Sequence, residues 1–302
     1  MKIAITGATG FLGKYLTDYL SEKSYEVLVI ARPEEDAKSI FQSEGSVFES
    51  DYSPESLSEA FKGIDVVIHL AAQTMQRDDH PLRVSNFFPV NIQLTENVMI
   101  AAQETGVQQL VQMSSNSVYS GANDLPFKES DNPVPTTIYG VSKLYAEKLG
   151  EYISHKRNIN IVSLRLARLF GFGERDTVVF TKYMKLAMQK KTIEVWGEGI
   201  TSVDYLYVRD AVSAIEKAIS SKLGSGIYNV GSGTAYSVKE IAATINKHCF
   251  NENKFIFDKS KKEGGYHLEM DSSKFYKASG WKPHWKLEEA VDEMYKLYQE
   301  KK

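Results

Sequence analysis

The chain contains 302 residues, about twice the length of an average domain, of which 42% are hydrophobic and 25% are charged. Its 36 basic and 39 acidic residues leave a formal net charge of −3, which excludes a broad basic surface for nucleic acid and a polyacidic tail. The single cysteine, Cys249, rules out an internal disulfide and favours a reducing compartment. Because no apolar run approaches about 18 residues and the first residues lack a signal-peptide pattern, we expect a cytoplasmic protein with no membrane contact.

Short apolar runs alternate with amphipathic segments through the first 166 residues. Strands are predicted at residues 2–6, 26–31, 47–49, 65–70, 110–114 and 159–166. Helices are predicted at residues 11–22, from 54 to about 62, 86–105 and about 137–155. Because the strands are apolar on both faces, this alternation predicts an α/β fold, a parallel sheet covered by helices on both sides. After Leu166 short strands and helices mix between glycines, which is typical of a smaller second part.

A glycine-rich turn follows the first predicted strand and opens the first predicted helix. A pyrophosphate must come very close to the backbone in such a turn, so side chains at Gly7 or Gly10 would block it, and the first amides of the helix point at the anion. Gly13 lets the helix pack against the strand. The turn therefore predicts a dinucleotide-binding site that includes Gly7, Thr9, Gly10, Phe11, Leu12 and Gly13.

The pattern Tyr-x-x-x-Lys occurs at Tyr19/Lys23, Tyr139/Lys143, Tyr152/Lys156 and Tyr298/Lys302. The pair Tyr139 and Lys143 stands apart, because it begins the helix that follows the fifth strand. It also follows Ser114 and Ser115, at the carboxyl end of that strand, where ligands bind in open parallel sheets. We therefore predict a site that contains Ser115, Tyr139 and Lys143.

These features resemble the extended branch of the short-chain dehydrogenases/reductases, which has the spacing Gly-x-x-Gly-x-x-Gly. The segments 164–171, 195–199, 204–210 and 228–233 are similar to motifs of its NAD(P)-dependent nucleotide-sugar epimerases and dehydratases. The resemblance implies a Rossmann-type, doubly wound parallel sheet with a smaller mixed α/β substrate-binding part at the C-terminus. We expect residues 1–166 to bind the dinucleotide, with residues from about 204 to 230 returning to that part, and residues 167–302 to bind the substrate. The family also implies a homodimer.

The resemblance implies a role for each member of the serine, tyrosine and lysine group. Tyr139 would exchange a proton with a substrate hydroxyl, Lys143 would lower the pKa of that phenol and hold the nicotinamide ribose, and Ser115 would bond the substrate oxygen. Further cofactor contacts implied by the family are Asp51, Tyr52, Leu70, Ala71, Ala72, Asn91 and Ser114. His69 is expected to be a core residue, and the six histidines show no spacing that predicts a metal site.

The end of the second strand bears on the choice of dinucleotide. A carboxylate there would bind the free ribose 2′-hydroxyl of NAD, but the sequence reads Ala31, Arg32, Pro33. A guanidinium could instead pair with the 2′-phosphate of NADP, or stack on adenine with either cofactor. Arg32 therefore favours NADP slightly over NAD.

Three departures from the family bear on the substrate. Arg168 replaces an asparagine that touches the sugar nucleotide, and Val203 replaces an arginine that binds its phosphate. Asn116 and Ser117 stand where 4,6-dehydratases carry acidic residues, which argues against dehydration. We predict that Ser115, Asn116, Arg168 and Lys182 bind a nucleotide-activated sugar, with Arg209, Lys261 and Lys262 as further candidates for the missing cation.

Two catalytic functions and one non-catalytic function fit these residues. The first is an epimerase that works at C4 through a transient keto sugar. The second is an NADPH-dependent reductase of a 4-keto sugar nucleotide, which the possible NADP preference and the altered phosphate site favour. The third is a dinucleotide-binding sensor or scaffold without chemistry, which the retained serine, tyrosine and lysine disfavour.

Overall fold

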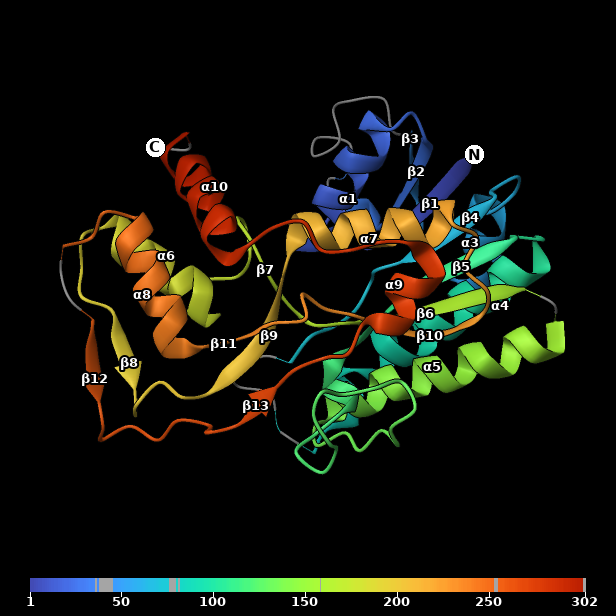
Figure 1. Cartoon of the computed structure of the whole chain (residues 1–302). Coiled ribbons are helices and arrows are strands. Elements are labelled where there is room, and N and C mark those ends of the chain that lie inside the picture. Colours follow the sequence, from blue (N-terminus) through green and yellow to red (C-terminus); the bar gives the residue numbers. More distant parts are fainter. Residues whose placement is uncertain are drawn as a thin grey trace.

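The computed structural model describes residues 1–35, 37, 46–75, 80, 82–157, 159–252 and 255–300. Its centre is a seven-stranded sheet in the order β10-β6-β5-β4-β1-β2-β3, in which every neighbouring pair is parallel (Figure 1). The strands are β1 (Lys2–Thr6), β2 (Glu26–Ala31), β3 (Ser46–Glu49), β4 (Val66–His69), β5 (Gln109–Ser115), β6 (Asn160–Leu166) and β10 (Gly226–Val230). This arrangement confirms the predicted Rossmann-type α/β fold.

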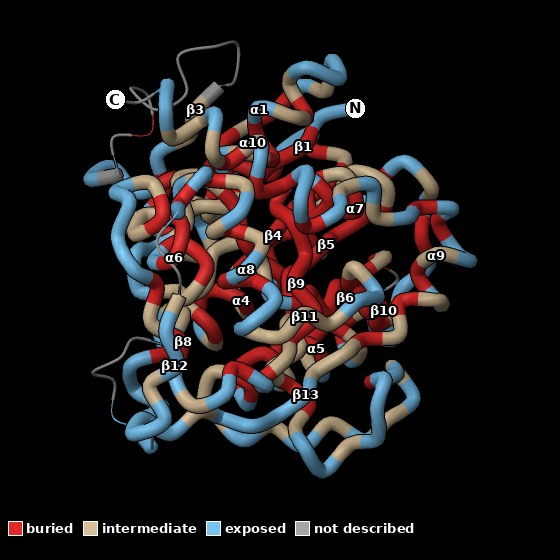
Figure 2. The backbone as a smooth tube through the Cα atoms, turned by 60° about the vertical axis from the view of Figure 1, so that its left-hand side comes forward, coloured by how far each residue is buried: buried red, intermediate tan, exposed pale blue. Residues whose placement is uncertain are grey.

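Helices cover both faces of the sheet, because successive strand residues alternate between two apolar cores. Ile3 and Ile5 face one core with α1 (Phe11–Glu22) and α7 (Val208–Ser220). Ala4 faces the other core with α3 (Pro54–Ala60), α4 (Thr95–Glu104) and α5 (Ile138–Arg157). Figure 2 shows the buried strands at the centre of the molecule and the exposed segments around them. The carboxyl ends of the parallel strands therefore meet at one edge, where the site is built.

Much of the chain after Leu166 forms a second region with its own sheets and core, whereas β10 joins the large sheet and α7 covers it (Figure 1). One sheet joins β7 (Arg168–Phe170), β9 (Ser202–Tyr207), β11 (Ala235–Ser237) and β13 (His267–Leu268), and a second joins β8 (Glu194–Trp196) with β12 (Ile256–Asp258). The helices are α6 (Val179–Met188), α8 (Val238–His248), α9 (Ser273–Ser279) and α10 (Leu287–Glu300). Phe180, Met184, Ile241 and Val291 lie in this second core, whereas Phe275 of α9 packs into the core on the α1 and α7 face of the large sheet. Cys249 is fully buried in the second core, where burial raises the pKa of its thiol to about 11.

The helix predicted over residues 86–105 differs from the observed structure. The segment begins with a 3₁₀ turn at Val84–Asn86, continues as a π-helix over Phe88–Leu94 and becomes α-helical at α4. Pro89 lies in the first turn of the π-helical stretch and cannot donate a backbone hydrogen bond, so the regular ladder starts after it. Among the described residues, no helix is both long enough and apolar enough to cross a membrane.

Candidate active site

A triad of side chains, Ser115, Tyr139 and Lys143, meets at the carboxyl end of β5. Ser115 is the last residue of that strand and hydrogen-bonds the Tyr139 side chain, which lies in the first turn of α5. The Lys143 Nζ is 5.8 Å from the centre of the Tyr139 ring and donates a hydrogen bond of 2.9 Å to the Met113 carbonyl of β5. All three line one cavity of about 540 Å³.

Gly140 explains how α5 comes close enough for this contact. A Cβ atom on Gly140 would lie 2.1 Å from the backbone oxygen of Ser117, in the turn that follows β5. Any larger residue would therefore push the start of α5 away from Ser115. The glycine that follows Tyr139 is the sequence signal for this close approach.

Burial has the largest effect on the pKa values of Tyr139 and Lys143. It raises the pKa of Tyr139 to about 12, although the hydrogen bond from Ser115 and the charge of Arg175 both act to lower that pKa. Burial also lowers the pKa of Lys143 to about 8, opposed by the carboxylate of Glu147. Burial thus keeps Tyr139 protonated at neutral pH, because the protein's own charges are too weak to offset it.

The glycine turn forms a cradle beside this group. Gly7 has a φ of +74°, and a Cβ atom there would lie 2.5 Å from the Ala71 backbone nitrogen. A Cβ atom on Gly13 would lie 2.3 Å from the Gly7 oxygen, so α1 could not pack against β1 with any other residue. The cavity is lined on this side by Gly7, Gly10, Phe11, Leu12, Gly13, Leu70, Ala72 and Ser114. These close approaches and the open α1 N-terminus fit the pyrophosphate and nicotinamide half of a dinucleotide. Of the other predicted contacts, Thr9 and Ala71 lie in the same turns without lining the cavity.

Three further predicted cofactor residues gather at the carboxyl ends of β2 and β3. The Arg32 guanidinium lies 6.0 Å from the centre of the Tyr52 ring and 3.9 Å from the carboxylate of Glu34. Tyr52 is buried and donates a hydrogen bond of 2.9 Å to the Ile30 carbonyl, and Asp51 is exposed. This group lies outside the cavity that holds the triad.

Two predicted polar residues support the site from behind. Asn91 is buried in the π-helical stretch, where its side chain bonds the backbone of Gln73 and donates to the Ser142 hydroxyl at 2.9 Å. It thereby ties the loop after β4 to α5. His69 is also buried, with its ring nitrogens 2.7 Å from the Thr6 hydroxyl and 3.0 Å from the Thr95 hydroxyl.

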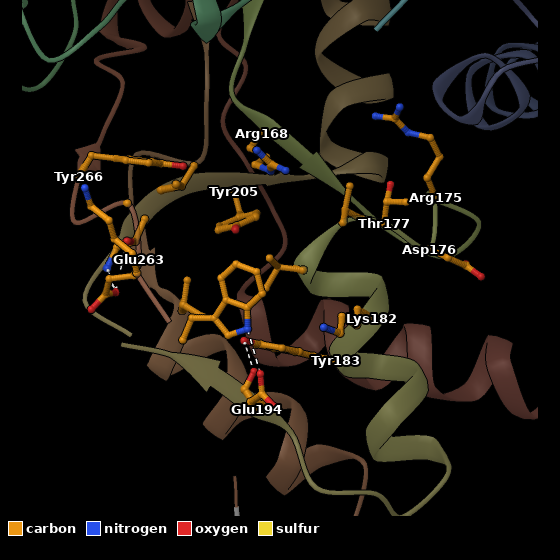
Figure 3. Close-up of a pocket in the computed structure, with 18 of the residues that line it drawn as sticks. Arg168, Arg175, Asp176, Thr177, Lys182, Tyr183, Glu194, Tyr205, Glu263 and Tyr266 are labelled. Carbon is orange, nitrogen blue, oxygen red and sulfur yellow. Dashed lines mark hydrogen bonds between the residues drawn. The ribbon is translucent and has the colours of Figure 1, made fainter. Parts of the chain in front are cut away.

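A second cavity of about 910 Å³ lies in the C-terminal region (Figure 3). The two cavities share the lining residues Met75, Arg168, Arg175 and Val178. Arg168 from β7 and Lys182 from α6 approach the second cavity from two sides. The structure thus brings these two predicted substrate residues together, and places Ser115 and Asn116 in the adjoining cavity.

The second cavity has an excess of unpaired positive charge. Its acidic residues are engaged elsewhere: Glu194 with Lys261 and Trp196, Glu263 with backbone amides of residues 198, 200 and 201, and Asp176 with Lys185. Within the described part of the chain, Arg168, Lys182 and Lys262 form no hydrogen bond or ion pair through their side chains. The cavity can therefore accept an anion without breaking an existing pair.

Two of the predicted cations are not free at the cavity, and three residues that line the cavity were not predicted from the sequence. Arg209 pairs with Glu293, and Lys261 pairs with Glu194 and Asp258, so neither is a free cation at the cavity. Trp196, Tyr266 and Arg175 line the second cavity and were not predicted as ligand contacts. Trp196 belongs to the segment 195–199, which is similar to a family motif, whereas no motif in the sequence identifies Arg175 or Tyr266 as a ligand contact.

Comparisons with known proteins agree with this architecture. A UDP-N-acetylglucosamine 4-epimerase from Bacillus cereus has 30% identical residues and a TM-score of 0.88, with 99% of this chain and 96% of that chain covered. The structure of MoeE5 in complex with UDP-glucuronic acid and NAD has 25% identity and a TM-score of 0.86, with both chains fully covered. The uncharacterized UDP-glucose epimerase YtcB of Bacillus subtilis is 28% identical over 258 residues, which is 81% of each chain.

A sequence model of one family covers most of the chain. It is the NAD-dependent epimerase/dehydratase family, and it matches residues 3–231. Together with the parallel sheet, the glycine cradle and the similarity over nearly the whole chain, this match establishes that the chain is an enzyme of the NAD-dependent epimerase/dehydratase family, in the extended branch of the short-chain dehydrogenases/reductases.

Proposed function

We propose that this enzyme is an NAD-dependent 4-epimerase of a UDP-sugar. The observation that carries the proposal is the continuity between the triad cavity and the cation-rich cavity, which share four lining residues. A sugar at the triad would then have its diphosphate next to Arg168 and Lys182. The similarity to a UDP-N-acetylglucosamine 4-epimerase supports both the sugar nucleotide and the reaction.

The proposed roles of the chain's own residues follow from their geometry. Tyr139 takes the proton of the C4 hydroxyl while Ser115 holds the same oxygen, which becomes a carbonyl in the keto sugar. Lys143 stabilises the phenolate by its charge and binds the nicotinamide ribose. When bound, a dinucleotide would supply the hydride acceptor and donor and a positive charge near Tyr139. After the keto sugar has turned its other face to the dinucleotide site, Tyr139 would return the proton to the C4 oxygen as C4 is reduced, which completes the inversion at C4.

The lining of the triad cavity disfavours dehydration. Asn116 and Ser117 supply no acid or base at the position that a 4,6-dehydratase needs. Glu174 is the carboxylate among the described lining residues, and it accepts hydrogen bonds from the backbone and side chain of Arg175. No free carboxylate among the described residues is thus placed to expel a C6 hydroxyl.

The second cavity supports a nucleoside diphosphate as the carrier of the sugar. Arg168 and Lys182 provide charge for the phosphates. Trp196, Tyr205 and Tyr266 provide ring surface for a base. Uracil is proposed as that base because the similar proteins of known complex bind UDP-sugars.

We propose NAD, not NADP, as the resident cofactor. Arg32 favours NADP when the sequence is considered alone, but the carboxylate of Glu34 lies 3.9 Å from its guanidinium and would repel a 2′-phosphate. Titration of the protein with each dinucleotide, followed by tryptophan fluorescence, tests this choice. Tighter binding of NADP that is lost in Arg32→Ala would contradict it.

Incubation with UDP-glucose, UDP-N-acetylglucosamine and UDP-glucuronic acid tests the reaction. A 4-epimerase interconverts the two C4 epimers of one of these sugars with no net use of the dinucleotide. Stoichiometric oxidation of NADPH on a 4-keto sugar nucleotide would instead identify a reductase, and would overturn the proposal.

Two further proposals concern organisation. The division into a dinucleotide-binding part of residues 1–166, with 204–230 returning to it, and a substrate-binding part of residues 167–302 rests on the two cores and on the position of β10 in the large sheet.

A homodimer is proposed through α4 and α5, where Ile100, Val141, Tyr145 and Tyr152 are exposed. Light scattering after gel filtration gives the mass in solution, and a mass near 34.0 kDa would contradict the dimer.

A further inference from the structure

A buried ion pair lies directly behind the triad, and the chemistry proposed above does not use it. Glu147 is on α5, one helical turn beyond Lys143, and its side chain is 0% exposed. Its partner Arg165 is on β6, with a side chain that is 2% exposed. An ion pair in such a place is costly to desolvate, so its geometry needs an explanation.

Every oxygen of the Glu147 carboxylate is bonded. Arg165 donates from Nε to Oε1 at 2.8 Å and from Nη2 to Oε2 at 2.7 Å, a two-pronged pair of hydrogen bonds. The Ser114 hydroxyl donates to Oε1 at 2.5 Å. The remaining guanidinium nitrogen, Nη1, donates to the Tyr119 hydroxyl at 2.6 Å, so the network reaches the segment after β5.

These hydrogen bonds hold β5, the strand that ends in Ser115, against α5 and β6. Ser114 stands between Met113, whose carbonyl accepts from Lys143, and Ser115. Consecutive residues of β5 are thus held by consecutive turns of α5, through Lys143 and then through Glu147. The relative position of Ser115 and Tyr139 depends on the same two elements.

We propose that Glu147 and Arg165 form a positioning pair that fixes the end of β5 against α5 and keeps the Lys143 ammonium charged. The inference rests on the proposed function, because the pair acts through the roles proposed for Ser115, Tyr139 and Lys143. Glu147 is a positioning residue and touches neither substrate nor cofactor.

The charges around Lys143 determine how readily its amine binds a proton. The groups that face it are Tyr139 and Glu147 on α5 and His69 on β4, and Arg165 on β6 bonds the same Glu147 carboxylate. Burial lowers the pKa of His69 to about 3, so that ring is neutral near pH 7, and Glu147 is the negative charge that raises the pKa of Lys143. Removing the Glu147 charge leaves Arg165 unpaired, and both changes disfavour the ammonium form.

Glu147→Gln is the direct test, because it keeps the shape of the side chain and removes its charge. Nuclear magnetic resonance of protein labelled with ¹³C at lysine Cε follows the titration of Lys143 without substrate, with the resonance assigned by its loss in Lys143→Arg. We expect a titration midpoint near 8 in the parent protein and a midpoint lower by about one pH unit or more in Glu147→Gln. An unchanged midpoint would overturn the electrostatic part of the proposal.

The matched control is Glu151→Gln, one further turn along α5. The Glu151 carboxylate is 41% exposed and pairs with Lys148 at 2.9 Å. The control removes the same charge from the same helix and should leave the Lys143 midpoint unchanged. A comparable shift in the control would show a general helix effect and contradict the proposal.

Ser114→Ala tests the positioning part separately, and it keeps the ion pair intact if Glu147→Gln fails to fold. We expect kcat per folded enzyme to fall about tenfold, with an unchanged Lys143 midpoint and little change in KM. Parental kcat in Ser114→Ala would overturn the positioning role. Because the lysine titration needs no turnover, it still decides the electrostatic part if the parent protein fails to epimerise any sugar nucleotide, a result that would count against the proposed function alone.

Discussion

The two ends of the active site differ in how firmly their side chains are held. At the carboxyl end of β5, Ser115, Lys143 and the residues behind them are bonded to the protein itself. In the C-terminal cavity, Arg168 and Lys182 have no partner among the described residues, and Trp196 is 46% exposed. Rigid groups suit a reaction that needs fixed geometry, and free cations suit the capture of an anionic ligand. The comparison predicts that changes at the first end lower kcat, whereas changes at the second raise KM.

Tyr139→Phe should give the largest effect on turnover. The variant keeps the ring packing and removes the hydroxyl proposed to exchange the substrate proton, so we expect kcat to fall about 1,000-fold or more while dinucleotide affinity stays within about threefold. Tyr152→Phe is the control, because Tyr152 stands on the same helix in the same Tyr-x-x-x-Lys pattern and is 63% exposed. Steady-state assays with each variant check this, and a fully active Tyr139→Phe would refute the mechanism.

Gly140→Ala should lower kcat without removing any reactive group. Its Cβ atom would meet the Ser117 oxygen, so the start of α5 must move away from Ser115, and we expect a loss of about 10- to 100-fold in kcat. Gly121→Ala is the control, since a Cβ atom there meets nothing within 4 Å. Equal kcat values for the two variants would show that the close approach of α5 is not required.

The end of the site at the carboxyl end of β5 was also the easier one to predict from the sequence. The strand and helix bounds at β1, α1 and β2 follow from local apolar patterns, and the positions of Ser115, Tyr139 and Lys143 follow from a motif placed after a strand. The pairing of Glu147 with Arg165 could not be predicted, because it joins a helix to a strand through burial and not through spacing. The π-helical stretch around Asn91 was missed because its pattern of apolar residues fits an α-helix equally well.

The second end was predicted less completely for a physical reason. Arg168 and Lys182 were chosen as charged residues near motifs, but their convergence depends on how β7 and α6 pack. Arg209 and Lys261 were equally plausible in the sequence and are engaged by Glu293 and Glu194. Which surface cation remains free is decided by tertiary contacts that a single sequence does not reveal.

Arg168→Ala and Lys182→Ala should each raise KM for the sugar nucleotide about tenfold and leave kcat within about twofold. The reason is that a charge-assisted hydrogen bond to phosphate contributes about 1.5 kcal/mol or more to binding. Lys191→Ala, which removes an exposed lysine just beyond α6 and outside the cavity, should change neither constant. A fall in kcat with an unchanged KM in the two cavity variants would reverse the proposed division between the two ends.

The last prediction concerns stability and not kinetics, and it comes from His69 at the rigid end. Burial lowers the pKa of this ring from 6.5 to about 3, with a smaller contribution from the charge of Lys143. Below pH 6.5 the unfolded chain binds a proton at His69 that the folded protein does not bind. The free energy of unfolding should therefore decrease as the pH falls from 6.5 towards 3, by up to about 1.4 kcal/mol per pH unit from this group.

His69→Gln isolates this contribution from those of other groups. Glutamine can still hydrogen-bond Thr6 or Thr95 but takes up no proton, so the variant should be less stable at pH 7 and should lose less stability on acidification. Urea unfolding at pH 7, 6, 5 and 4 gives both slopes. The His80→Gln control changes an exposed histidine outside the helices and strands and should keep the parental slope. If parent and His69→Gln lose stability in parallel, the pKa of His69 is the same in the folded and the unfolded chain, and burial does not lower it.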